Sequence, residues 1–341
     1  MTKKAYARAG VDVDLGNRLK RGIHSLVRGT HGPQVLGKLG GFGGLFAADF
    51  AGMREPVLVA SMDGVGTKLK IAFAADKHDT VGADLVNHCV NDIAVIGARP
   101  LFFLDYIGAE KLEPRVFSQL LRGFARACRG ARCALIGGET AQMPGMYRPG
   151  EYDVAGCIVG VVDRRDIIDG SGIKPGDAIL GLASNGLHTN GYSLAREILF
   201  ERSRLRLGSR IPGLRGTLGA ELLRVHTNYQ PLLAKAPAGM IHGLAHITGG
   251  GLVDNVPRVL PDNCDAVIDT NSWRVPRIFE FLRDKGGIDS TEMYQVFNMG
   301  IGMVAMVSAG DVAKARALLR ARMIGHVEAG TGKTRLLWAP F

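Results

Sequence analysis

The chain has 341 residues, of which 46% are hydrophobic and 22% charged, so it is long and apolar enough to bury a substantial core. This composition excludes a disordered, charge-rich chain, and 47 glycines without a repeat indicate many tight turns rather than a collagen helix. Forty-two Lys and Arg residues against 32 Asp and Glu residues give a net charge of +10. That balance favours anionic partners such as nucleotides, phosphorylated metabolites or nucleic acid.

The basic residues are scattered and are not interleaved with aromatic side chains, which make up 6% of the chain. We therefore expect no nucleic-acid partner. The longest apolar run, residues 154–162, is much shorter than the ~20 residues that cross a bilayer, so we expect no membrane association. The five cysteines are odd in number and form no CxxC pair, and no apolar segment follows the first lysines, so we expect a cytoplasmic protein with reduced thiols.

In the first half of the chain, apolar runs and helical spacings alternate. The segment 80–96 has Leu85, Cys89 and Ile93 at helical spacing, and its acids and amides lie on the opposite side, which predicts a helix with one apolar and one polar stripe. The other predicted elements are strands at 57–61, 101–107, 133–136 and 154–162 and a helix at 114–129, and the strand at 133–136 is expected to enter a Gly-Gly-Glu turn.

Residues 169–177 are rich in glycine and polar residues and are the best linker in the chain, so we expect domains at 1–170 and 171–341. The second half again alternates strands and helices. Its predicted strands lie at 178–183, 244–247, 266–269 and 300–307. Its predicted helices begin at residue 193 and after the turn 248–251, and two more lie at 276–285 and 312–322. The pattern predicts two α/β domains.

Several acids stand at the ends of these elements. Asp63 follows a strand and is followed by Lys68, Asp84 and Asp92 share one side of a helix, and Glu139 lies in the expected turn. Each of them alone is as typical of a cap or a solvated turn. Together, carboxylates beside glycine-rich backbone indicate a site for Mg²⁺ and nucleotide phosphates.

Residues 92–100 read DIAVIGARP and match the pattern D-x4-G-A-x-P. Further motifs surround it in order: GGFG at 40–43, DGVGTK at 63–68, GGETAQMPGMY at 137–147, HTNGYS at 188–193 and TGGG at 248–251. With these motifs the chain resembles the phosphoribosylformylglycinamidine cyclo-ligase family, the aminoimidazole ribonucleotide synthetases. The resemblance covers nearly the whole chain, from about residue 10 to residue 307.

The resemblance implies a PurM-like fold of two α/β domains, with the N-terminal domain binding ATP and pairing into a homodimer through a shared β-barrel, and with the C-terminal domain binding substrate. It also implies the reaction. ATP phosphorylates the formyl amide oxygen of formylglycinamidine ribonucleotide, a nitrogen attacks the activated carbon, and phosphate leaves as 5-aminoimidazole ribonucleotide forms. The phosphorylated oxygen is a good leaving group, whereas an amide oxygen is a poor one.

Carried over by motif, the Mg²⁺ ligands would be Asp63, Asp92 and Glu139. The residues implied in ATP binding are Gly40, Gly41, Gly43, Asp63, Gly64, Gly66, Thr67, Lys68, Asn91 and Asp92, with Lys68 offsetting triphosphate charge. The catalytic candidates are Glu139, His188 and Lys68. The substrate candidates are Gly138, Asn190, Thr248, Gly249 and Gly250, the last three for the ribose 5-phosphate.

Alternatives stay open at individual residues. Glu139 would serve as a metal ligand, as a proton acceptor, or only as a cap for a neighbouring amide. His188 would hold a phosphate or protonate a leaving oxygen, or be structural. The family motif has an acid where this chain has Gln142, so Gln142 is assigned no proton transfer, and His88 is interpreted as part of the polar helix side rather than as a ligand.

Three rival functions remain at this stage. The first is another ATP-using enzyme of the same fold, such as selenophosphate synthetase, thiamine-monophosphate kinase or the hydrogenase-maturation dehydratase. A selenophosphate synthetase would need a cysteine in the early glycine loop, and residues 37–44 have none. The others are a basic nucleic-acid-binding protein, whose affinity would fall steeply with salt, and an inactive scaffold that tolerates loss of Asp63 and Asp92.

Overall fold

The computed structural model describes residues 5–38 and 40–338, without the side chains of residues 7, 20 and 21. The chain divides into two compact units, residues 1–93 with 100–161 and residues 94–99 with 162–341. Each unit is built around one β-sheet. No helix in the described residues has both the length and the apolar character needed to cross a membrane.

The first unit contains a four-stranded sheet in the order β1-β4-β2-β3. Its strands are β1 (Pro56–Gly64), β2 (Arg99–Ala109), β3 (Ala134–Gln142) and β4 (Tyr152–Asp163). Strands β2 and β3 are parallel, and helix α6 (Pro114–Ala131) connects them, as a parallel pair requires. Proline suits the first turn of α6, and the left-handed Arg132 (φ 55°) ends the helix.

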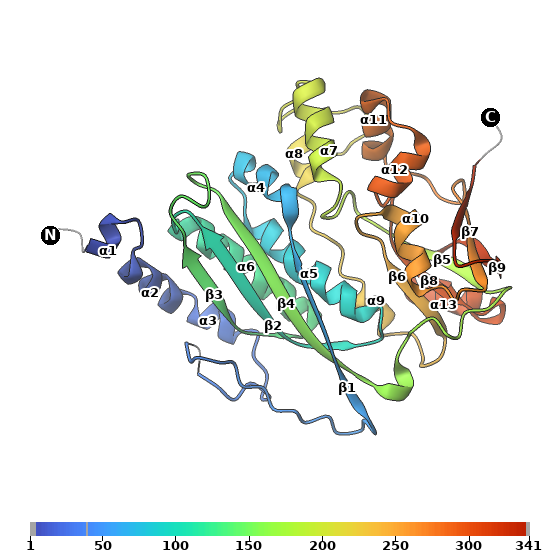
Figure 1. Cartoon of the computed structure of the whole chain (residues 1–341), viewed down its shortest axis with the longest axis horizontal. Coiled ribbons are helices and arrows are strands. Elements are labelled where there is room, and N and C mark those ends of the chain that lie inside the picture. The colour runs from blue at the N-terminus through green and yellow to red at the C-terminus, as the bar shows by residue number, and fades with distance from the viewer. Residues whose placement is uncertain (1–4, 39, 339–341) are drawn as a thin grey trace. The chain divides into compact units, whose positions relative to one another are not determined.

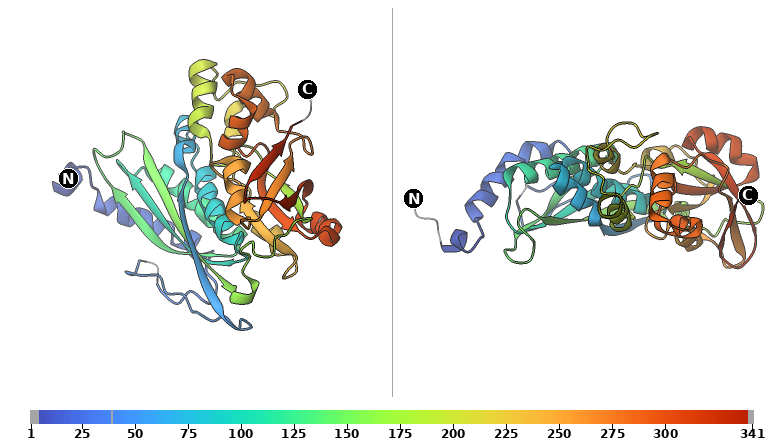
Figure 2. Two further views of the ribbon diagram at one scale, coloured as in Figure 1. Left: turned by 45° about the vertical axis from the view of Figure 1, so that its right-hand side comes forward. Right: turned by 90° about the horizontal axis from the view of Figure 1, so that it is seen from above.

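Helices cover one face of this sheet, as Figure 1 shows for α5 and α6. The bounds are α1 (Ala5–Arg8), α2 (Val13–Gly22), α3 (His24–Arg28), the 3₁₀ turn η1 (Gly66–Lys68), α4 (Leu69–Ala75) and α5 (Asp79–Ala94). Phe103 of β2 and Phe124 of α6 are fully buried, with ring centroids 6.4 Å apart. Helix α3 packs against α6 and β3, which places the N-terminal helices beside the β3 edge (Figure 2).

Helix α5 is confirmed as a helix, but its polar side does not face water. Asp84, Asn87, His88 and Asn91 are all buried, as are the apolar residues of the other stripe. The sequence predicts the polar stripe of this helix but does not predict its burial. Buried polar groups need partners in the protein, so the polar stripe of α5 is held by specific contacts rather than by solvent.

Two glycines let α5 and α6 approach closely. A Cβ atom on Gly82 would lie 2.5 Å from the carbonyl oxygen of Leu120, and one on Gly123 would collide with the carbonyl oxygen of Asp79. Gly130, also in α6, has nothing within 4 Å of its ideal Cβ position. Within α6, Gly123 therefore has no space for a side chain, whereas Gly130 has open space around it.

We expect Gly123→Ala to lower the free energy of unfolding by roughly 2 kcal/mol or more, because the two helix backbones must separate. Gly130→Ala is the matched control and is expected to be neutral or to stabilise by roughly 0.5–1 kcal/mol, since alanine favours a helix interior. Urea denaturation of both variants measures the difference. Equal stabilities of the two variants would show that the close helix contact carries no packing constraint.

Strand β3 is longer than the sequence pattern predicts. It continues through Gly137 and Gly138 to Gln142, so Glu139 lies in a strand opposite Tyr106 of β2, and the predicted Gly-Gly-Glu turn is wrong. Gly138 is required there for a different reason. A side chain on Gly138 would collide with the backbone and carboxylate of Asp105, its partner on β2.

The second unit contains a six-stranded sheet in the order β10-β7-β9-β5-β8-β6. Its strands are β5 (Ala178–Ala183), β6 (Ile241–His246), β7 (Cys264–Asp269), β8 (Ile301–Val307), β9 (Arg322–Ala329) and β10 (Thr334–Leu337). The pairs are antiparallel except for β10 beside β7. The two strands nearest the C-terminus, β9 and β10, were not predicted from the sequence.

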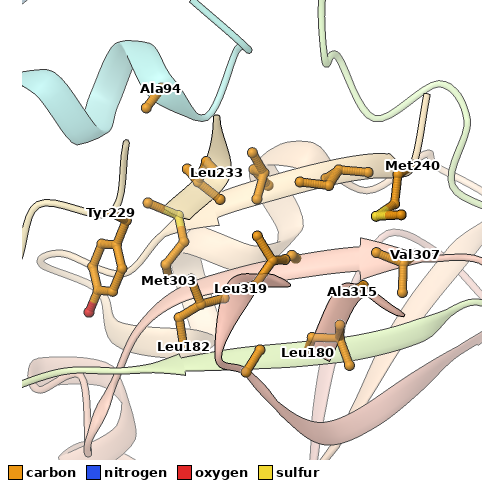
Figure 3. Packing of buried hydrophobic residues seen from close by; sticks show 14 of the residues in the cluster. Ala94, Leu180, Leu182, Tyr229, Leu233, Met240, Met303, Val307, Ala315 and Leu319 are labelled. Carbon is orange, nitrogen blue, oxygen red and sulfur yellow. The ribbon is translucent and has the colours of Figure 1, made fainter. Parts of the chain in front are cut away.

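The helices and turns of this unit are short. They are η2 (Arg164–Asp166), α7 (Tyr192–Arg196), the π-helix η3 (Glu197–Arg202), α8 (Leu218–Leu222), α9 (Gln230–Leu233), α10 (Gly251–Asn255), η4 (Val256–Val259), α11 (Arg277–Gly286), α12 (Ser290–Val296), η5 (Ala309–Asp311) and α13 (Val312–Leu319). Figure 3 shows Leu182 and Met303 of the sheet packed with Leu319 of α13 and Leu233 of α9 in a buried cluster.

The predicted helix at 312–322 is wrong at its C-terminal end. Arg320 adopts a left-handed conformation (φ 53°) that ends α13, and Arg322 is the first residue of β9. The helical spacing of the preceding apolar residues gives no signal for this change of direction, because it depends on the pairing of β9 with β5 and β7.

Candidate functional site

The end of β1 and the polar side of α5 form an acidic cluster within the first unit. Nε2 of His88 lies 2.8 Å from Oδ2 of Asp63, and the hydroxyl of Ser61 donates to Oδ2 of Asp92 at 3.1 Å. Residues 61 and 63 lie on the same side of β1, and residues 88 and 92 are one turn apart on α5. These two contacts bring the predicted ligands Asp63 and Asp92 to one place.

Charge in this cluster is concentrated around His88. A ring nitrogen of His88 and a carboxylate oxygen of Asp92 lie within 4.8 Å of each other. Burial lowers the pKa of His88, but its hydrogen bond to Asp63 and the negative charges of Asp92, Asp63 and Asp84 outweigh burial and raise the pKa above its ordinary value. The side chain of Asp63 is 42% exposed, so this carboxylate is accessible to a ligand from solvent.

Lys68 and Asp84 form an ion pair beside this cluster. Their Nζ and Oδ2 atoms are 2.7 Å apart, and both side chains are fully buried. Burial lowers the pKa of Lys68, while the charge of Asp84 and the hydrogen bond to it act in the opposite direction. The pair ties the 3₁₀ turn Gly66–Lys68, which follows the Asp63 motif, to the middle of α5.

The early glycine loop lies in a different part of the first unit. Gly40, Gly41, Gly43 and Gly44 line a cavity of about 680 Å³. Its other walls come from residues of α3, α6 and β3, among them Leu121, Gly138 and Glu139. A volume of this size, with mostly apolar walls and a few polar groups, is typical of small-molecule pockets.

Glu139 is not brought together with Asp63 and Asp92 inside one chain. It lies on β3, whereas Asp63 lies on β1, and these strands form opposite edges of the sheet. Three interstrand spacings separate the two edges by about 14 Å. The carboxylate of Glu139 is exposed and accepts a hydrogen bond of 2.7 Å from the amide of Thr140.

The predicted substrate residues of the second unit meet at a glycine turn before α10. Gly250 has φ 95°, and Asn255 of α10 donates to the carbonyl oxygens of Gly249 at 3.0 Å and Gly251 at 2.8 Å. The hydroxyl of Thr248 donates to Oδ1 of Asn255 at 3.3 Å. Oδ1 of Asn190 lies 3.5 Å from the ideal Cβ position on Gly249, so both motifs form one local site.

His188 lies behind this turn rather than in an open position. It is 1% exposed and adopts a left-handed backbone conformation (φ 61°). Its Nε2 atom accepts a hydrogen bond from the amide of Asn185 at 3.4 Å, and its ring stacks on that of His226 at 4.0 Å. Its surroundings are those of a packed histidine, which keeps the structural alternative open.

Three residues that organise these sites are not predicted from the sequence to do so. His88 was interpreted as a polar helix position, yet it contacts Asp63; its spacing of four from both Asp84 and Asp92 was the available signal. Asp84 is predicted to lie on the polar side of the helix, but its ion pair with Lys68 is not predicted, because the family motif assigns Lys68 to the nucleotide. Asn255, which holds the glycine turn, has no signal in the sequence because its role depends on the path of the turn.

Comparison with known families identifies both units. Residues 49–162 match the model of the AIR synthase related protein N-terminal domain, and residues 174–336 match that of the AIR synthase related protein C-terminal domain. A relative in Anaeromyxobacter sp. (strain Fw109-5) is 53% identical over 335 residues, which are 96% of this chain and 97% of the relative. One in Syntrophotalea carbinolica is 55% identical over 89% of this chain and 87% of its own. Both are named phosphoribosylformylglycinamidine cyclo-ligase.

Solved structures with the same fold are more distant in sequence. The hydrogenase maturation protein HypE in complex with ATP superimposes with a TM-score of 0.68 at 19% identity, covering 96% of this chain and 93% of HypE. Thiamine-monophosphate kinase from Stenotrophomonas maltophilia gives a TM-score of 0.67 at 16% identity, covering 96% of both chains. At these identities the likeness establishes the fold alone.

Proposed function

The chain belongs to the AIR synthase related family through both of its domains, and we propose that it is an ATP-dependent phosphoribosylformylglycinamidine cyclo-ligase of purine biosynthesis. It converts formylglycinamidine ribonucleotide and ATP into 5-aminoimidazole ribonucleotide, ADP and phosphate. The observation that carries this proposal is an identity of more than half to relatives of that name along nearly the whole chain. The acidic cluster at β1 and α5 supports it on chemical grounds.

The reaction places two demands on the protein. The γ-phosphoryl group of ATP must meet the formyl amide oxygen, and the nitrogen that closes the ring must then reach the activated carbon as phosphate leaves and a proton is lost. Positioning the reactants and offsetting phosphate charge supply most of the acceleration for such a transfer. Both domains contribute, because we assign ATP to the first and the ribonucleotide to the second.

We assign Mg²⁺ to Asp63 and Asp92, with ATP phosphates completing its ligands. The residues fit this ion: the carboxylates of Asp63 on β1 and Asp92 on α5 belong to one cluster around His88, Asp63 is accessible, and hard oxygen ligands are those that Mg²⁺ prefers. When bound, the ion would neutralise charge on the phosphates. Glu139 stays a proposed ligand or proton acceptor, at a position distinct from this pair within one chain.

ATP binding is proposed for the backbone of the two glycine motifs. Gly64, Gly66 and Thr67 follow Asp63 directly, and Gly66 has φ 67°, a conformation that lets successive amides point to one anion. Asn91 stands beside Asp92 on α5. Within one chain the cavity lined by Gly40, Gly41 and Gly43 lies beside β3 and not beside Asp63, so this loop is proposed for ATP on its motif alone.

Lys68 receives a narrower role than the family motif implies. Its ammonium would have to leave the buried carboxylate of Asp84 to reach a triphosphate. Leaving a buried charge without its counter-charge is costly. The buried pair therefore favours a positioning role for Lys68, in which it holds the turn after Asp63 against α5.

The ribonucleotide is assigned to the turn of Thr248, Gly249 and Gly250 together with Asn190, since both motifs meet there. Backbone amides of a turn with left-handed glycines suit a phosphate group. Gly138 of β3 stays a proposed substrate residue on the family motif alone, and in the structure its missing side chain makes room for Asp105. His188 lies behind the turn as a candidate for proton transfer or for support.

We propose that the first unit forms a homodimer through its four-stranded sheet. Leu58 and Met62 lie on one face of the edge strand β1 and are 62% and 68% exposed. Large exposed apolar side chains on one sheet face are typical of an interface, and pairing two such sheets would cover them. The free cysteines suit the reducing cytoplasm, which we propose as its location.

A coupled assay tests the reaction. Purified protein with formylglycinamidine ribonucleotide and MgATP is expected to form the aminoimidazole and ADP in a ratio of one to one, with no ADP release when the ribonucleotide is omitted. Replacing it with thiamine monophosphate is the matched control for the kinase alternative of the same fold. ADP formation with thiamine monophosphate and none with the ribonucleotide would overturn the proposal.

A further inference from the structure

Three histidines of the second unit are buried and lie together, and the cyclisation as proposed uses only one of them. His188, His226 and His246 are 1%, 0% and 6% exposed. They come from three segments: the loop after β5, the segment between α8 and α9, and the last residue of β6. The rings of His226 and His246 have their centroids 5.1 Å apart, and His226 stacks on His188.

Both ring nitrogens of His226 are engaged. Nδ1 lies 3.2 Å from the hydroxyl of Thr189, and Nε2 lies 3.0 Å from Nε2 of His246. These are hydrogen-bond distances inside the protein, where an interrupted bond costs the desolvation of the group left behind. The ring cannot rotate without losing both contacts.

The two partners of His226 stand next to the proposed substrate residues. Thr189 directly precedes Asn190, and His246 stands two residues before Thr248. Asn190 and Gly249 face each other across the same local site. His226 therefore joins, through one ring, the two segments whose relative position determines the shape of that site.

The contact between His226 and His246 also couples their protonation patterns. Two ring nitrogens 3.0 Å apart cannot both carry a proton and remain hydrogen-bonded, so one donates and the other accepts. The hydroxyl of Thr189 donates or accepts as needed. The tautomer of His246 is thus tied to that of His226, and through it to Thr189.

We propose that His226 is a positioning residue of the cyclo-ligase. Through its two ring nitrogens it holds residues 188–190 and residues 246–250 in the arrangement that binds the ribonucleotide. The proposal rests on the proposed function, because it takes Asn190 and the glycine turn as the ribonucleotide site. His226 itself is fully buried, so we assign it no direct contact with a reactant.

Three substitutions separate positioning from packing. His226→Leu removes both hydrogen bonds. His226→Asn keeps an amide near the place of Nδ1 and thus the Thr189 contact, whereas His226→Gln keeps one near Nε2 and thus the His246 contact. We expect the leucine variant to raise KM for the ribonucleotide by about tenfold or more, with KM for ATP unchanged, and each amide variant to recover part of the loss.

The controls distinguish failure of this inference from failure of the proposed function. His326→Gln removes an exposed histidine of β9 and is expected to change neither KM. Asn190→Ala tests the site itself and is expected to raise KM for the ribonucleotide. If Asn190→Ala raises this KM and the His226 variants do not, positioning by His226 is wrong; if Asn190→Ala leaves it unchanged, the ribonucleotide site is wrong.

A measurement that does not depend on enzymatic activity tests the proposal even if the leucine variant does not fold. Long-range ¹H–¹⁵N spectra of the wild-type protein are expected to show one proton between the Nε2 atoms of His226 and His246, and His226→Gln is expected to shift the His246 ring signals. Spectra in which both Nε2 atoms carry no proton, or in which the variant leaves the His246 signals unchanged, would overturn the proposal.

Discussion

Asp92→Asn is expected to lower turnover by ~100-fold or more. The substitution keeps the size of the side chain and an oxygen for the Ser61 hydroxyl, but it removes the negative charge from one of two carboxylates assigned to Mg²⁺. Initial rates at saturating ribonucleotide and MgATP measure the effect. Raising the Mg²⁺ concentration is expected to recover part of the rate, because the loss begins with weaker metal binding.

Asp262→Asn is the matched control. Asp262 is an exposed aspartate of the second unit, just before β7, and the same change there is expected to leave turnover within a factor of two of the wild type. Near-normal turnover in Asp92→Asn would remove this carboxylate from the mechanism. It would also revive the interpretation of the chain as an inactive scaffold of the fold.

Lys68→Met is expected to lower the free energy of unfolding by about 3–5 kcal/mol, because it removes the ammonium partner from the fully buried carboxylate of Asp84. Methionine keeps most of the volume of the lysine side chain, so the effect reports the charge rather than a cavity. Denaturation in urea at neutral pH measures it. The matched control is Lys285→Met, which replaces an exposed lysine of α11. It is expected to change the free energy of unfolding by less than ~0.5 kcal/mol.

The double variant Lys68→Met with Asp84→Leu tests whether Lys68 acts by pairing with Asp84 or by binding the triphosphate. Replacing both charges by apolar groups is expected to restore most of the stability, since a buried ion pair often contributes little over a packed apolar pair. If the restored protein also keeps the wild-type KM for ATP, Lys68 acts through Asp84. A large increase of that KM in a stable double variant would instead return Lys68 to the triphosphate, as the family motif implies.

The elements that the sequence predicts well are those with a local signal. Helix α6 begins at a proline and shows a strong apolar stripe, and strands β4 and β5 are continuous apolar runs. Asp63 and Asp92 could be paired only through the family motifs, and the structure brings them together through Ser61 and His88. Local sequence patterns predict an element correctly where residues close in the sequence determine its backbone conformation.

The failures share a cause in contacts between distant segments. The sequence predicts a turn for the Gly-Gly-Glu segment, but it is a strand because β2 lies beside it, and Gly138 gives room to Asp105. The sequence predicts the polar stripe of α5 but not its burial, which depends on contacts such as those of Ser61 with Asp92 and of Lys68 with Asp84. Strand order likewise decides that Glu139 lies far from Asp63, and no pattern in the sequence specifies that order.

The position of β9 in the second sheet has a consequence for synthesis of the chain. This strand, residues 322–329, joins β7 and β10 on one side to β5, β8 and β6 on the other, although it follows β5, β6, β7 and β8 in the chain. Until β9 pairs, β7 is separate from the sheet of β5, β8 and β6, and both have an open edge. Open strand edges are prone to pair with other chains. The first unit, whose strands all lie before residue 164, can fold while the ribosome is still translating the second.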